Sequence, residues 1–487
     1  MESVLELALA LWRQGERFAA LGAARQAVAI APGHARTQVV FAAIQRQIGY
    51  VDGAVAALER AHELDPDDAE TLRMLSDVYR RARRLPEALR AAELAFERDP
   101  SVASEISLGH ALLANEALPE SEAMFDRALA ADERDVRAWV GRARLALVRA
   151  DWNAARAALE RARELAPGDP DVRYGLALLH LRSGRFAEGY AEYSAIMDTD
   201  SDGARYYYHR EGVARWNGEP LGDRRLVISS DQGLGDHIMM ARFFDALPES
   251  KPAVIVETPP ALLTLFRRNF PNVRFARFTH WQSPASWDVH LPITQLPCVN
   301  GIAAASDISG RAYLCADPER VRAWRRRVAD GANVRNVGIV WHGNRQNTRD
   351  RWRAAPLHHW EPLAKLSGVR FHSLQIGADE AVLRPAPFPL VSHALGDFDD
   401  TAALMTALDA VISVDTSTIH LAGALGRPAW LPNPLVSDFR WGIYGAESPW
   451  YASVRVIRQA VADDWAPVFA TIADELGAFI SRERPDR

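Results

Sequence analysis

Cysteine is scarce in this sequence, because Cys298 and Cys315 are the only two among 487 residues. Two cysteines exclude a disulfide framework and a four-cysteine metal site, and we expect both to be buried as small hydrophobic side chains. No apolar run reaches the roughly 18 residues that a membrane-spanning helix needs, so the sequence predicts no such helix. The net charge of -6 argues against non-specific binding of nucleic acids, which requires a basic surface.

A basic signal peptide is also missing, since the first residues, Met1 to Glu6, carry acidic side chains instead. We therefore expect a cytoplasmic protein. The composition, 48% hydrophobic and 25% charged, is that of an ordinary globular protein. A chain of 487 residues is too long for one hydrophobic core, so about two or three domains are expected.

Residues 1–202 repeat with a period of 34. Prolines recur at Pro32, Pro66, Pro100 and Pro167, and two series of small residues keep the same spacing apart from one interval of 33. Two amphipathic helices with small residues at their crossing and proline at the turn form the tetratricopeptide pattern, of which we count about six copies. The two series are Ala8, Ala42, Ser76, Gly109, Ala143 and Ala177, and Ala27, Ala61, Ala95, Ala128 and Ala162.

Helix pairs of this kind cannot bury their apolar faces alone, so they stack into an α solenoid with a concave groove. We expect the groove to bind a protein partner, and a rigid spacer or a dimerisation surface is the alternative. The run Arg80-Arg81-Ala82-Arg83-Arg84 is the basic cluster of this region. It could meet an acidic partner, although a solvated turn between helices is the simpler interpretation.

Residues 203–224 form an aromatic-rich connector that contains Tyr206-Tyr207-Tyr208 and Trp216. A flexible linker would be rich in glycine and serine instead. We therefore expect this connector to pack against the second half of the chain.

From residue 225 onwards, predicted strands alternate with predicted helices, which indicates parallel sheets with ligands at the carboxyl ends of the strands. The pattern restarts after residue 330, so we expect two Rossmann-like lobes, 225–330 and 331–487, with a site in the cleft between them. A closing helix is predicted over Trp465 to Ile480. The predicted strands are Arg225–Ser230, Val254–Glu257, Val273–Phe275, Asp288–Pro292, Val337–Trp341, Phe371–Gln375, Val411–Val414 and Arg427–Leu431.

Each lobe contains a polar turn between a strand and a helix. The glycine-rich turn Asp231–Asp236 precedes a helix predicted over His237–Leu247, and the turn Asp415–Thr418 precedes one over Ile419–Leu425. Unpaired N–H groups at the positive end of a helix can bind a phosphate or a sugar hydroxyl. An ordinary crossover with a capping side chain is the alternative.

Several motifs occur in the order in which one protein family carries them. The chain resembles the bacterial tetratricopeptide-repeat proteins with a C-terminal GT-B glycosyltransferase domain, which are similar to heptosyltransferases and, more distantly, to O-linked N-acetylglucosamine transferases. Members with this architecture include flagellin glycosyltransferases, in which the repeats bind flagellin. The matching segments are Gln232–Phe243, Asp288–Pro292, Val337–Asn344, Ser373–Gln375, Asp397–Leu404, Val414–Pro428 and Arg440–Trp441 with Ser448–Tyr451.

The resemblance implies that the first lobe faces the acceptor. The general base proposed for heptosyltransferases corresponds to Asp236, with His237 as the second candidate and Gly233 and Gly235 as glycines of the turn. A carboxylate at a helix start stays ionised and can accept a proton. The alternative role for Asp236 is to cap the helix.

The resemblance also implies that the second lobe holds the nucleotide-sugar. Arg353 matches a basic residue of the family, although Ala354 replaces the usual serine, and Arg345, Arg349 and Arg351 compete for its role. The run Asp397–Asp400 predicts a helix cap and not a metal site, and neither metal nor cofactor is expected. The other candidates for binding the nucleotide-sugar are Asn344, Gln375, Asp415, Thr416, Ser417, Thr418 and His420.

These features together predict an inverting, metal-independent glycosyltransferase. It would transfer a sugar from a nucleotide-activated donor to a Ser/Thr hydroxyl of a protein, with flagellin suspected as that protein. Two alternatives stay open. The acceptor could be a glycan or a lipid-linked sugar, or the chain could be a non-catalytic scaffold with a degenerate GT-B module.

Overall fold

The computed structural model describes residues 2–197, 213–248, 254–278, 287–329, 334–344, 350–376, 385–443 and 445–482. It contains two compact units: Met1–Leu176 with Ala195–His209, and Ala177–Ser194 with Arg210–Arg487. The expected fold class, an α solenoid followed by two Rossmann-like lobes of the GT-B type, is confirmed. Tyr206–Tyr208, Arg345, Arg349 and the side chain of Arg351, all named above, lie outside the described residues.

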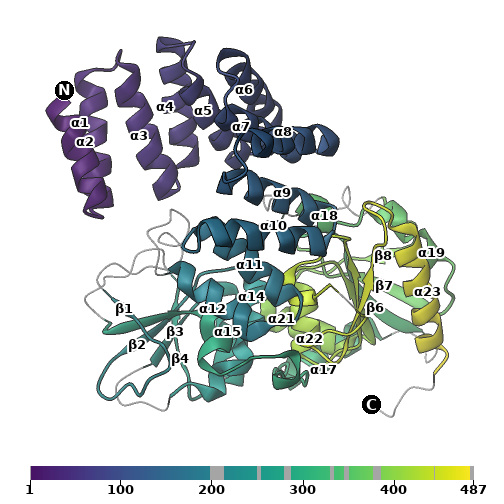
Figure 1. Cartoon of the computed structure of the whole chain (residues 1–487). Helices are drawn as coiled ribbons and strands as arrows, with labels where there is room; N and C mark the ends of the chain where they lie inside the picture. Colours follow the sequence, from purple (N-terminus) through teal and green to yellow (C-terminus); the bar gives the residue numbers. More distant parts are fainter. Residues whose placement is uncertain are drawn as a thin grey trace. The chain divides into compact units, whose positions relative to one another are not determined.

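Twelve helices in antiparallel hairpins form the repeat region (Figure 1). Both predicted series of small residues are buried, because each small side chain lets one helix cross another closely. The helices are α1 Glu2–Arg13, α2 Arg17–Ile30, α3 Ala35–Ile48, α4 Val51–Leu64, α5 Ala69–Arg81, α6 Leu85–Arg98, α7 Val102–Ala114, α8 Leu118–Ala131, α9 Val136–Val148, α10 Trp152–Leu165, α11 Pro170–Arg182 and α12 Phe186–Met197.

The turn inside each hairpin has its own repeated feature. One residue per turn adopts a positive φ, and these residues follow the same period as the small residues. Glycine accepts this conformation readily, whereas a side chain makes it strained. Glycine occupies this position in three of the six turns, at Gly15, Gly49 and Gly184. The other three turns carry a strained residue there: Arg83, Glu116 and Ala150.

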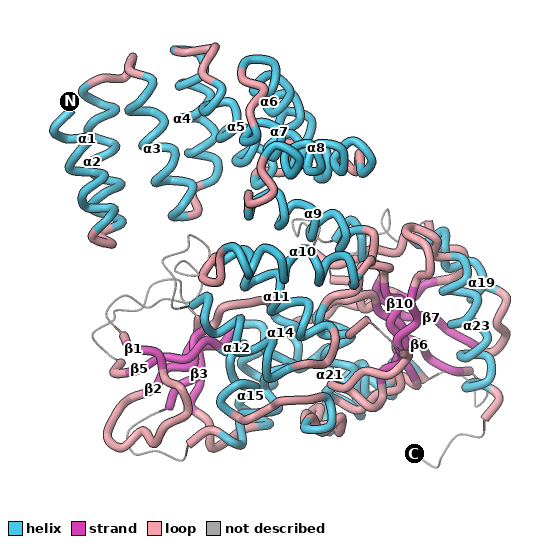
Figure 2. The backbone as a smooth tube through the Cα atoms, viewed as in Figure 1, coloured by secondary structure: helices cyan, strands magenta, loops and turns pink. Residues whose placement is uncertain are grey.

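The α/β region contains two parallel sheets, drawn in magenta in Figure 2. The first lobe is built on the order β1-β5-β2-β3-β4, and the second on β11-β10-β9-β6-β7-β8. The strands are β1 Ala214–Arg215, β2 Leu226–Ser229, β3 Val254–Thr258, β4 Arg274–Arg277, β5 Val289–Pro292, β6 Arg335–Val340, β7 Val369–Ser373, β8 Leu390–Val391, β9 Ala410–Ser413, β10 Ala429–Asn433 and β11 Val454–Arg458.

Strand order reverses once in each sheet. In the second lobe, successive strands run outwards in opposite directions from the boundary between β6 and β9. In the first lobe, β2, β3 and β4 run outwards on one side of the boundary between β2 and β5, and β5 and β1 lie on the other side. Loops that leave such a boundary at the carboxyl ends of the strands diverge and leave room for a ligand. The two polar turns that the sequence singles out follow β2 and β9, so both lie at these boundaries.

The connector enters the first sheet, since β1 pairs in parallel with β5 and the indole of Trp216 is buried in the same core. The predicted helix over His237–Leu247 is different in the structure: α14 spans Leu234–Met240 and a 3₁₀ segment, η1, spans Ala241–Ala246. The other helices that concern the site are α15 Leu263–Asn269, α16 Leu296–Val299, α17 Pro318–Val328, α18 Asp350–Arg353, α21 Phe398–Ala407, α22 Ser417–Ala424 and α23 Ala466–Ile480.

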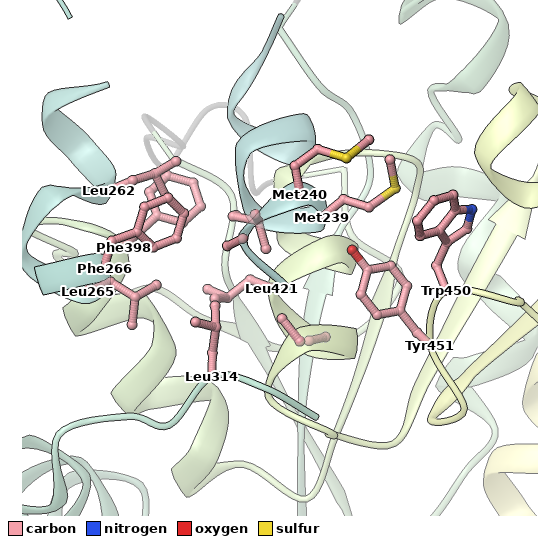
Figure 3. Packing of buried hydrophobic residues seen from close by; sticks show 14 of the residues in the cluster. Met239, Met240, Leu262, Leu265, Phe266, Leu314, Phe398, Leu421, Trp450 and Tyr451 are labelled. Carbon is pink, nitrogen blue, oxygen red and sulfur yellow. The ribbon is translucent and has the colours of Figure 1, made fainter. Parts of the chain in front are cut away.

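One hydrophobic core runs through both lobes (Figure 3). Met239 and Met240 of α14 belong to it, together with Leu421 of α22 and the pair Trp450 and Tyr451. Phe266 of α15 joins the same cluster, and α15 also contacts α21. Helices of the first lobe therefore pack directly on helices of the second lobe at two places.

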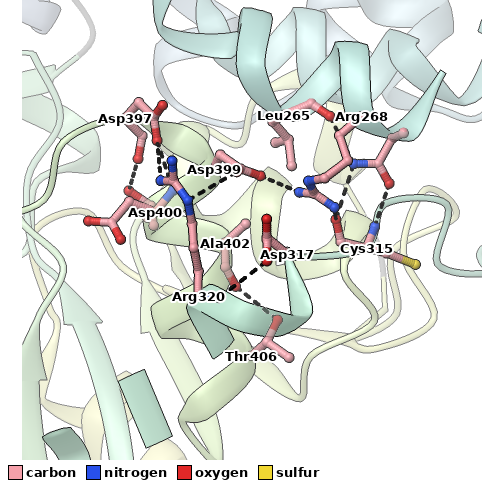
Figure 4. A network of polar contacts seen from close by, with 12 residues as sticks. Leu265, Arg268, Cys315, Asp317, Arg320, Asp397, Asp399, Asp400, Ala402 and Thr406 are labelled. Carbon is pink, nitrogen blue, oxygen red and sulfur yellow. Dashed lines mark hydrogen bonds and ion pairs between the residues drawn. The ribbon is translucent and has the colours of Figure 1, made fainter. Parts of the chain in front are cut away.

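A polar network reinforces the second of these contacts (Figure 4). The carboxylate of Asp399 is almost fully buried and pairs with Arg268 of α15, and Arg320 of α17 lies 3.6 Å from it. Asp397 accepts a hydrogen bond from the amide of Asp400 at 2.8 Å and caps α21, which confirms the prediction of a helix cap at this run. These acidic side chains thus hold arginines and a helix start.

Cys298 and Cys315 are exposed, so the prediction that both are buried was wrong. In each segment a leucine just before the cysteine takes the inward place, since Leu296 and Leu314 are buried instead. Among the helices of the described residues, none has both the length and the apolar character needed to cross a membrane.

Candidate functional site

The turn after β2 is shorter than the sequence predicts. Gly233 is the N-cap of α14 and Leu234 is already helical, so Asp236 and His237 lie within the first turn of the helix. The side chain of Asp236 therefore does not cap α14, and its partner lies elsewhere in the fold.

Asp236 instead meets an arginine of the other lobe. Nε of Arg440 donates a hydrogen bond to Oδ1 of Asp236 at 2.9 Å, and Nη2 of Arg440 donates to the same oxygen. Nη1 of Arg440 donates to Asp438 at 2.6 Å. Oδ2 of Asp236 accepts no hydrogen bond from the described residues, so one oxygen of the carboxylate stays available.

Arg440 is the positive centre of this site. Its side chain is 13% exposed, and those of Asp236 and Asp438 are similarly buried. Burial alone would lower the pKa of Arg440, but Asp236, Asp438 and Asp415 together hold it well above its ordinary value. Three carboxylates from three segments of the chain therefore face one guanidinium group.

Gly235 marks a point of close approach between the lobes along α14. A Cβ atom at this position would lie 2.8 Å from Cδ2 of His420, which belongs to α22 of the second lobe. The same atom at Gly233 would meet only Oδ2 of Asp236, at 3.7 Å. Neither glycine has a positive φ, so Gly235 is required for close approach and not for backbone conformation.

The ring of His420 is fixed on several sides. Its Nδ1 lies 3.0 Å from the hydroxyl of Tyr451, its Nε2 lies 3.8 Å from Asp415, and it packs against the indole of Trp441. Burial, together with the smaller effect of the charge of Arg440, lowers the pKa of His420 to about 3. His420 is therefore a neutral ring that sits between the two lobes.

The start of α22 matches the sequence prediction in part. Thr416 is its N-cap, and its Oγ1 accepts a hydrogen bond from the amide of Thr418 at 3.3 Å. Ser417 is the first residue of the helix. Asp415 precedes the cap, and burial raises its pKa, with the charge of Asp438 adding to the shift while Arg353 and Arg440 oppose it.

The loops after β6 and β7 bring two further candidates together. Oε1 of Gln375 accepts a hydrogen bond from the amide of His342 at 3.4 Å, so the two strand ends are adjacent. Asn344 is exposed two residues further along the same loop. Arg353, in α18, lies close enough to Asp415 and His420 for its charge to influence the pKa of both.

The first lobe contributes buried polar groups that the sequence did not single out. Asp231 accepts hydrogen bonds from the amide of Thr294 at 3.3 Å and from its hydroxyl, which ties the loop after β2 to the loop after β5. Burial raises the pKa of Asp231 to about 7. A further buried polar group comes from the repeat region: the hydroxyl of Tyr190, in α12, has no hydrogen-bond partner among the described residues.

His237 is less suited to proton transfer than Asp236. Its ring is fully buried, Nδ1 donates to the carbonyl of Gly233 at 2.9 Å, and Nε2 has no partner among the described residues. Burial lowers the pKa of His237. This geometry corresponds to a neutral ring that holds the turn after β2.

The arrangement offers a carboxylate with a free oxygen, a buried cation and a helix start within one polar cluster. Among the described residues, no group of three or more His, Cys, Asp or Glu side chains could hold a metal ion. Arg440 lies in one of the motifs that carry the family resemblance, but no pattern in the sequence assigns it a role. Its position in the fold could not be deduced, because it is 204 residues from Asp236.

Comparisons with known proteins find tetratricopeptide repeats in this chain. The tetratricopeptide-repeat family matches residues 44–103 and 146–209. Protein FlbA of Caulobacter vibrioides is 30% identical over 355 residues, which cover 64% of this chain and 57% of FlbA. The chain therefore spans little more than half the length of this relative.

Solved structures give only weak likenesses. A tetratricopeptide-repeat protein of Thermus thermophilus is 21% identical, with a TM-score of 0.32, and the match covers 34% of this chain and 91% of that protein. PilW, a type IV pilus biogenesis factor, is 18% identical, with a TM-score of 0.34, and the match covers 41% of this chain and 92% of PilW.

We predict that Gly235→Ala destabilises the α/β region. The added methyl group would clash with the ring of His420, which cannot move without losing its contacts to Tyr451 and Trp441. Overpacking costs about 1–3 kcal/mol, more than the gain of up to about 1 kcal/mol in helix propensity. Urea unfolding followed by tryptophan fluorescence measures the change. Gly233→Ala is the matched control and should change stability by no more than about 0.5 kcal/mol; an equal loss in both variants would contradict this explanation.

We also predict that His420 makes the stability of the α/β region sensitive to acid. Its folded-state pKa of about 3 lies below its ordinary value, so the folded state binds fewer protons than the unfolded state. The stability that follows is complete above about pH 6.5 and is lost as pH falls from there towards 3, by up to about 1.4 kcal/mol per pH unit. His420→Gln should therefore show a shallower decline between about pH 6.5 and about pH 4 than the wild-type protein. Parallel declines would mean that this ring is not the group responsible.

Proposed function

We propose that this protein is a glycosyltransferase that moves a sugar from a nucleotide-activated donor to a Ser/Thr hydroxyl of a protein. One observation carries the proposal: Asp236 of the first lobe meets Arg440 of the second, beside the start of α22. The turns at both strand-order boundaries thus converge on one polar cluster, where a ligand of an α/β sheet is expected.

The first part of this scheme concerns the acceptor. Asp236 has one oxygen held by Arg440 and the other without a described partner. We assign to Oδ2 the acceptance of the proton from the acceptor hydroxyl as the hydroxyl oxygen attacks the anomeric carbon. The bond between the anomeric carbon and the phosphate oxygen breaks, and the nucleotide leaves with that electron pair. Attack from the face opposite the leaving group would invert the configuration of the sugar.

The second part of the scheme concerns stabilisation of the leaving group, which carries negative charge. The helix start at Thr416, Ser417 and Thr418 offers N–H groups and a positive partial charge, and Arg440 and Arg353 offer cations. In metal-independent GT-B enzymes these are the groups that stabilise a departing phosphate, and we assign them that role here. Asn344 and Gln375 lie at the neighbouring strand ends, where we place the nucleoside.

Arg440 has two roles in this scheme, because it faces both the proton acceptor Asp236 and the charged end of the donor. Asp415 and Asp438 act on the same guanidinium group, and the charge of Arg353 also reaches Asp415. An incoming phosphate would compete with these carboxylates for Arg440 and Arg353. We assign Asp415, whose pKa is raised by burial, to the sugar hydroxyls of the donor.

The repeats supply the reason for a protein acceptor. Tetratricopeptide repeats indicate protein–protein binding, and two long stretches of the first half of the chain match them. The resemblance to tetratricopeptide-repeat glycosyltransferases makes flagellin the acceptor that we propose.

We predict that Asp236→Asn lowers transfer at least about 100-fold without loss of folding, because asparagine keeps the shape but cannot take up a proton. Release of nucleotide from a nucleotide-sugar, with purified flagellin as acceptor, measures transfer. Near-normal turnover in a correctly folded variant would contradict the role of Asp236.

A double-mutant cycle separates proton acceptance from the ion pair. If Asp236 only anchored Arg440, adding Asp236→Asn to Arg440→Gln would cost nothing further. If Asp236 accepts the proton, the asparagine variant still loses about 100-fold in the Arg440→Gln background. Arg440→Gln alone should mainly raise the KM for the donor.

A further inference from the structure

The end of the repeat region belongs to the same compact unit as the α/β region. This segment, Ala177–Ser194, includes most of α12. Near the start of α12, the amide of Ala187 donates a hydrogen bond to the carbonyl of Ala303 in the first lobe at 3.0 Å. Further along the helix, the carbonyl of Ser194 accepts a hydrogen bond from Nη1 of Arg215, in β1, at 2.7 Å. The first lobe therefore anchors α12 at two points.

The second lobe also contacts this segment. At the end of α11, Nε of Arg182 donates a hydrogen bond to the carbonyl of Ser437 at 3.1 Å. Ser437 immediately precedes Asp438, which pairs with Arg440. The end of the repeat region therefore packs against the loop that carries the buried cation of the candidate site.

Packing holds the ring of Tyr190 between these contacts. Tyr190 is 3% exposed, and its ring centroid lies 6.4 Å from that of Phe186, which in turn lies 5.7 Å from the ring of Trp450. The hydroxyl group has no hydrogen-bond partner within the part of the chain that the structure describes. A buried hydroxyl without a partner destabilises the folded state, so its retention is better explained by binding of a substrate than by stability.

The hydroxyl of Tyr190 lies near the charged groups of the candidate site. Burial raises the pKa of Tyr190 above its ordinary value, so the hydroxyl keeps its proton. The charges of Arg440 and Asp236 also reach Tyr190, the first lowering its pKa and the second raising it. A neutral phenol donates one hydrogen bond. Tyr190 can therefore donate to an oxygen atom that lies next to Asp236.

The acceptor hydroxyl fits between these two groups. Oδ2 of Asp236 can only accept and the hydroxyl of Tyr190 can donate, yet no hydrogen bond joins them among the described side chains. A Ser/Thr hydroxyl between them would donate its proton to Asp236 and accept a hydrogen bond from Tyr190 with one lone pair. Its other lone pair would then face the anomeric carbon.

We propose that the hydroxyl of Tyr190 binds the oxygen atom of the acceptor hydroxyl and orients it for attack on the donor sugar. This inference rests on the proposed function, which supplies the acceptor and the role of Asp236. During transfer the acceptor oxygen forms its bond to the anomeric carbon, its proton passes to Asp236, and Tyr190 keeps its own proton throughout. The last repeat helix thus contributes a side chain to the reaction, and correct orientation of the attacking oxygen is its contribution to the rate.

Tyr190→Phe tests the proposal in the full chain, because it removes the hydroxyl and keeps the ring. Thermal unfolding should give a Tm equal to or above that of the wild-type protein, since no hydrogen bond within the fold is lost. The kcat/KM for the acceptor should fall about tenfold, the effect of losing one hydrogen bond to the reacting oxygen. The KM for the nucleotide-sugar should stay at its wild-type value. Release of nucleotide, with purified flagellin as acceptor, measures both constants.

Tyr313→Phe is the matched control, because the hydroxyl of Tyr313 donates a hydrogen bond to the carbonyl of Ile238 at 2.7 Å. Loss of this bond should lower the Tm, whereas kcat/KM for the acceptor should stay at its wild-type value. The two variants are therefore expected to separate stability from transfer in opposite ways.

Three results would overturn the role of Tyr190. The first is a fall in the Tm of Tyr190→Phe like that of Tyr313→Phe, which would mean that the hydroxyl is bonded within the fold. The second is an unchanged kcat/KM for the acceptor, and the third is a raised KM for the donor with no effect on the acceptor. An active wild-type protein matched by Tyr190→Phe overturns this inference alone, whereas a wild-type protein that transfers no sugar contradicts the proposed function and this inference with it.

Discussion

The close approach of α14 to α22 is the constraint on which the candidate site depends. Gly235 allows the ring of His420 to lie against the backbone of α14, and a methyl group would not fit there. The residue that follows, Asp236, is thereby brought to Arg440, and the next turn of the helix places Met239 and Met240 in the core shared by both lobes. Apolar packing and the ion pair thus fix the same geometry.

Charge at this meeting point is unevenly distributed. Asp236, Asp415 and Asp438 surround Arg440, and these groups come from three different segments of the chain. A buried cation with several carboxylates is costly to hold without good hydrogen-bond geometry, and its retention is more easily explained by function than by stability. The neutral ring of His420 beside it limits the charge of the site, because a protonated imidazole there would face Arg440 at close range.

Much of the fold follows from patterns that the sequence displays openly. The small residues at a period of 34 predict the helix crossings because only small side chains fit there, and runs such as Val411–Val414 predict buried strands. The strand order did not follow from these patterns, since it depends on contacts between segments far apart. The boundaries at β2–β5 and β6–β9, which position the polar turns, became visible only in the structure.

The candidate site also combines residues that could be predicted from the sequence with one that could not. Asp236 and the turn at Asp415–Thr418 could be selected because they lie next to a strand and a helix, where local rules apply. Arg440 lies in a short 3₁₀ segment, η7 Phe439–Trp441, and no periodicity points to it. For the two cysteines, a general rule led to a wrong prediction. Free cysteine tends to be buried, but in these segments the larger apolar residues Leu296 and Leu314 occupy the buried positions and the cysteines are exposed.

The most direct test of the central claim is whether the α/β region binds a nucleotide. Thermal unfolding of the full chain would be compared with UDP, GDP, ADP, CDP and CMP, each with and without a metal chelator. A ligand at about 100 times its Kd stabilises the part that binds it by roughly 2.7 kcal/mol. Stabilisation by one of these nucleotides, unchanged by the chelator and lost in Arg440→Gln, is the result that we predict. The absence of any shift with all five nucleotides would contradict a nucleotide-sugar site between α14 and α22.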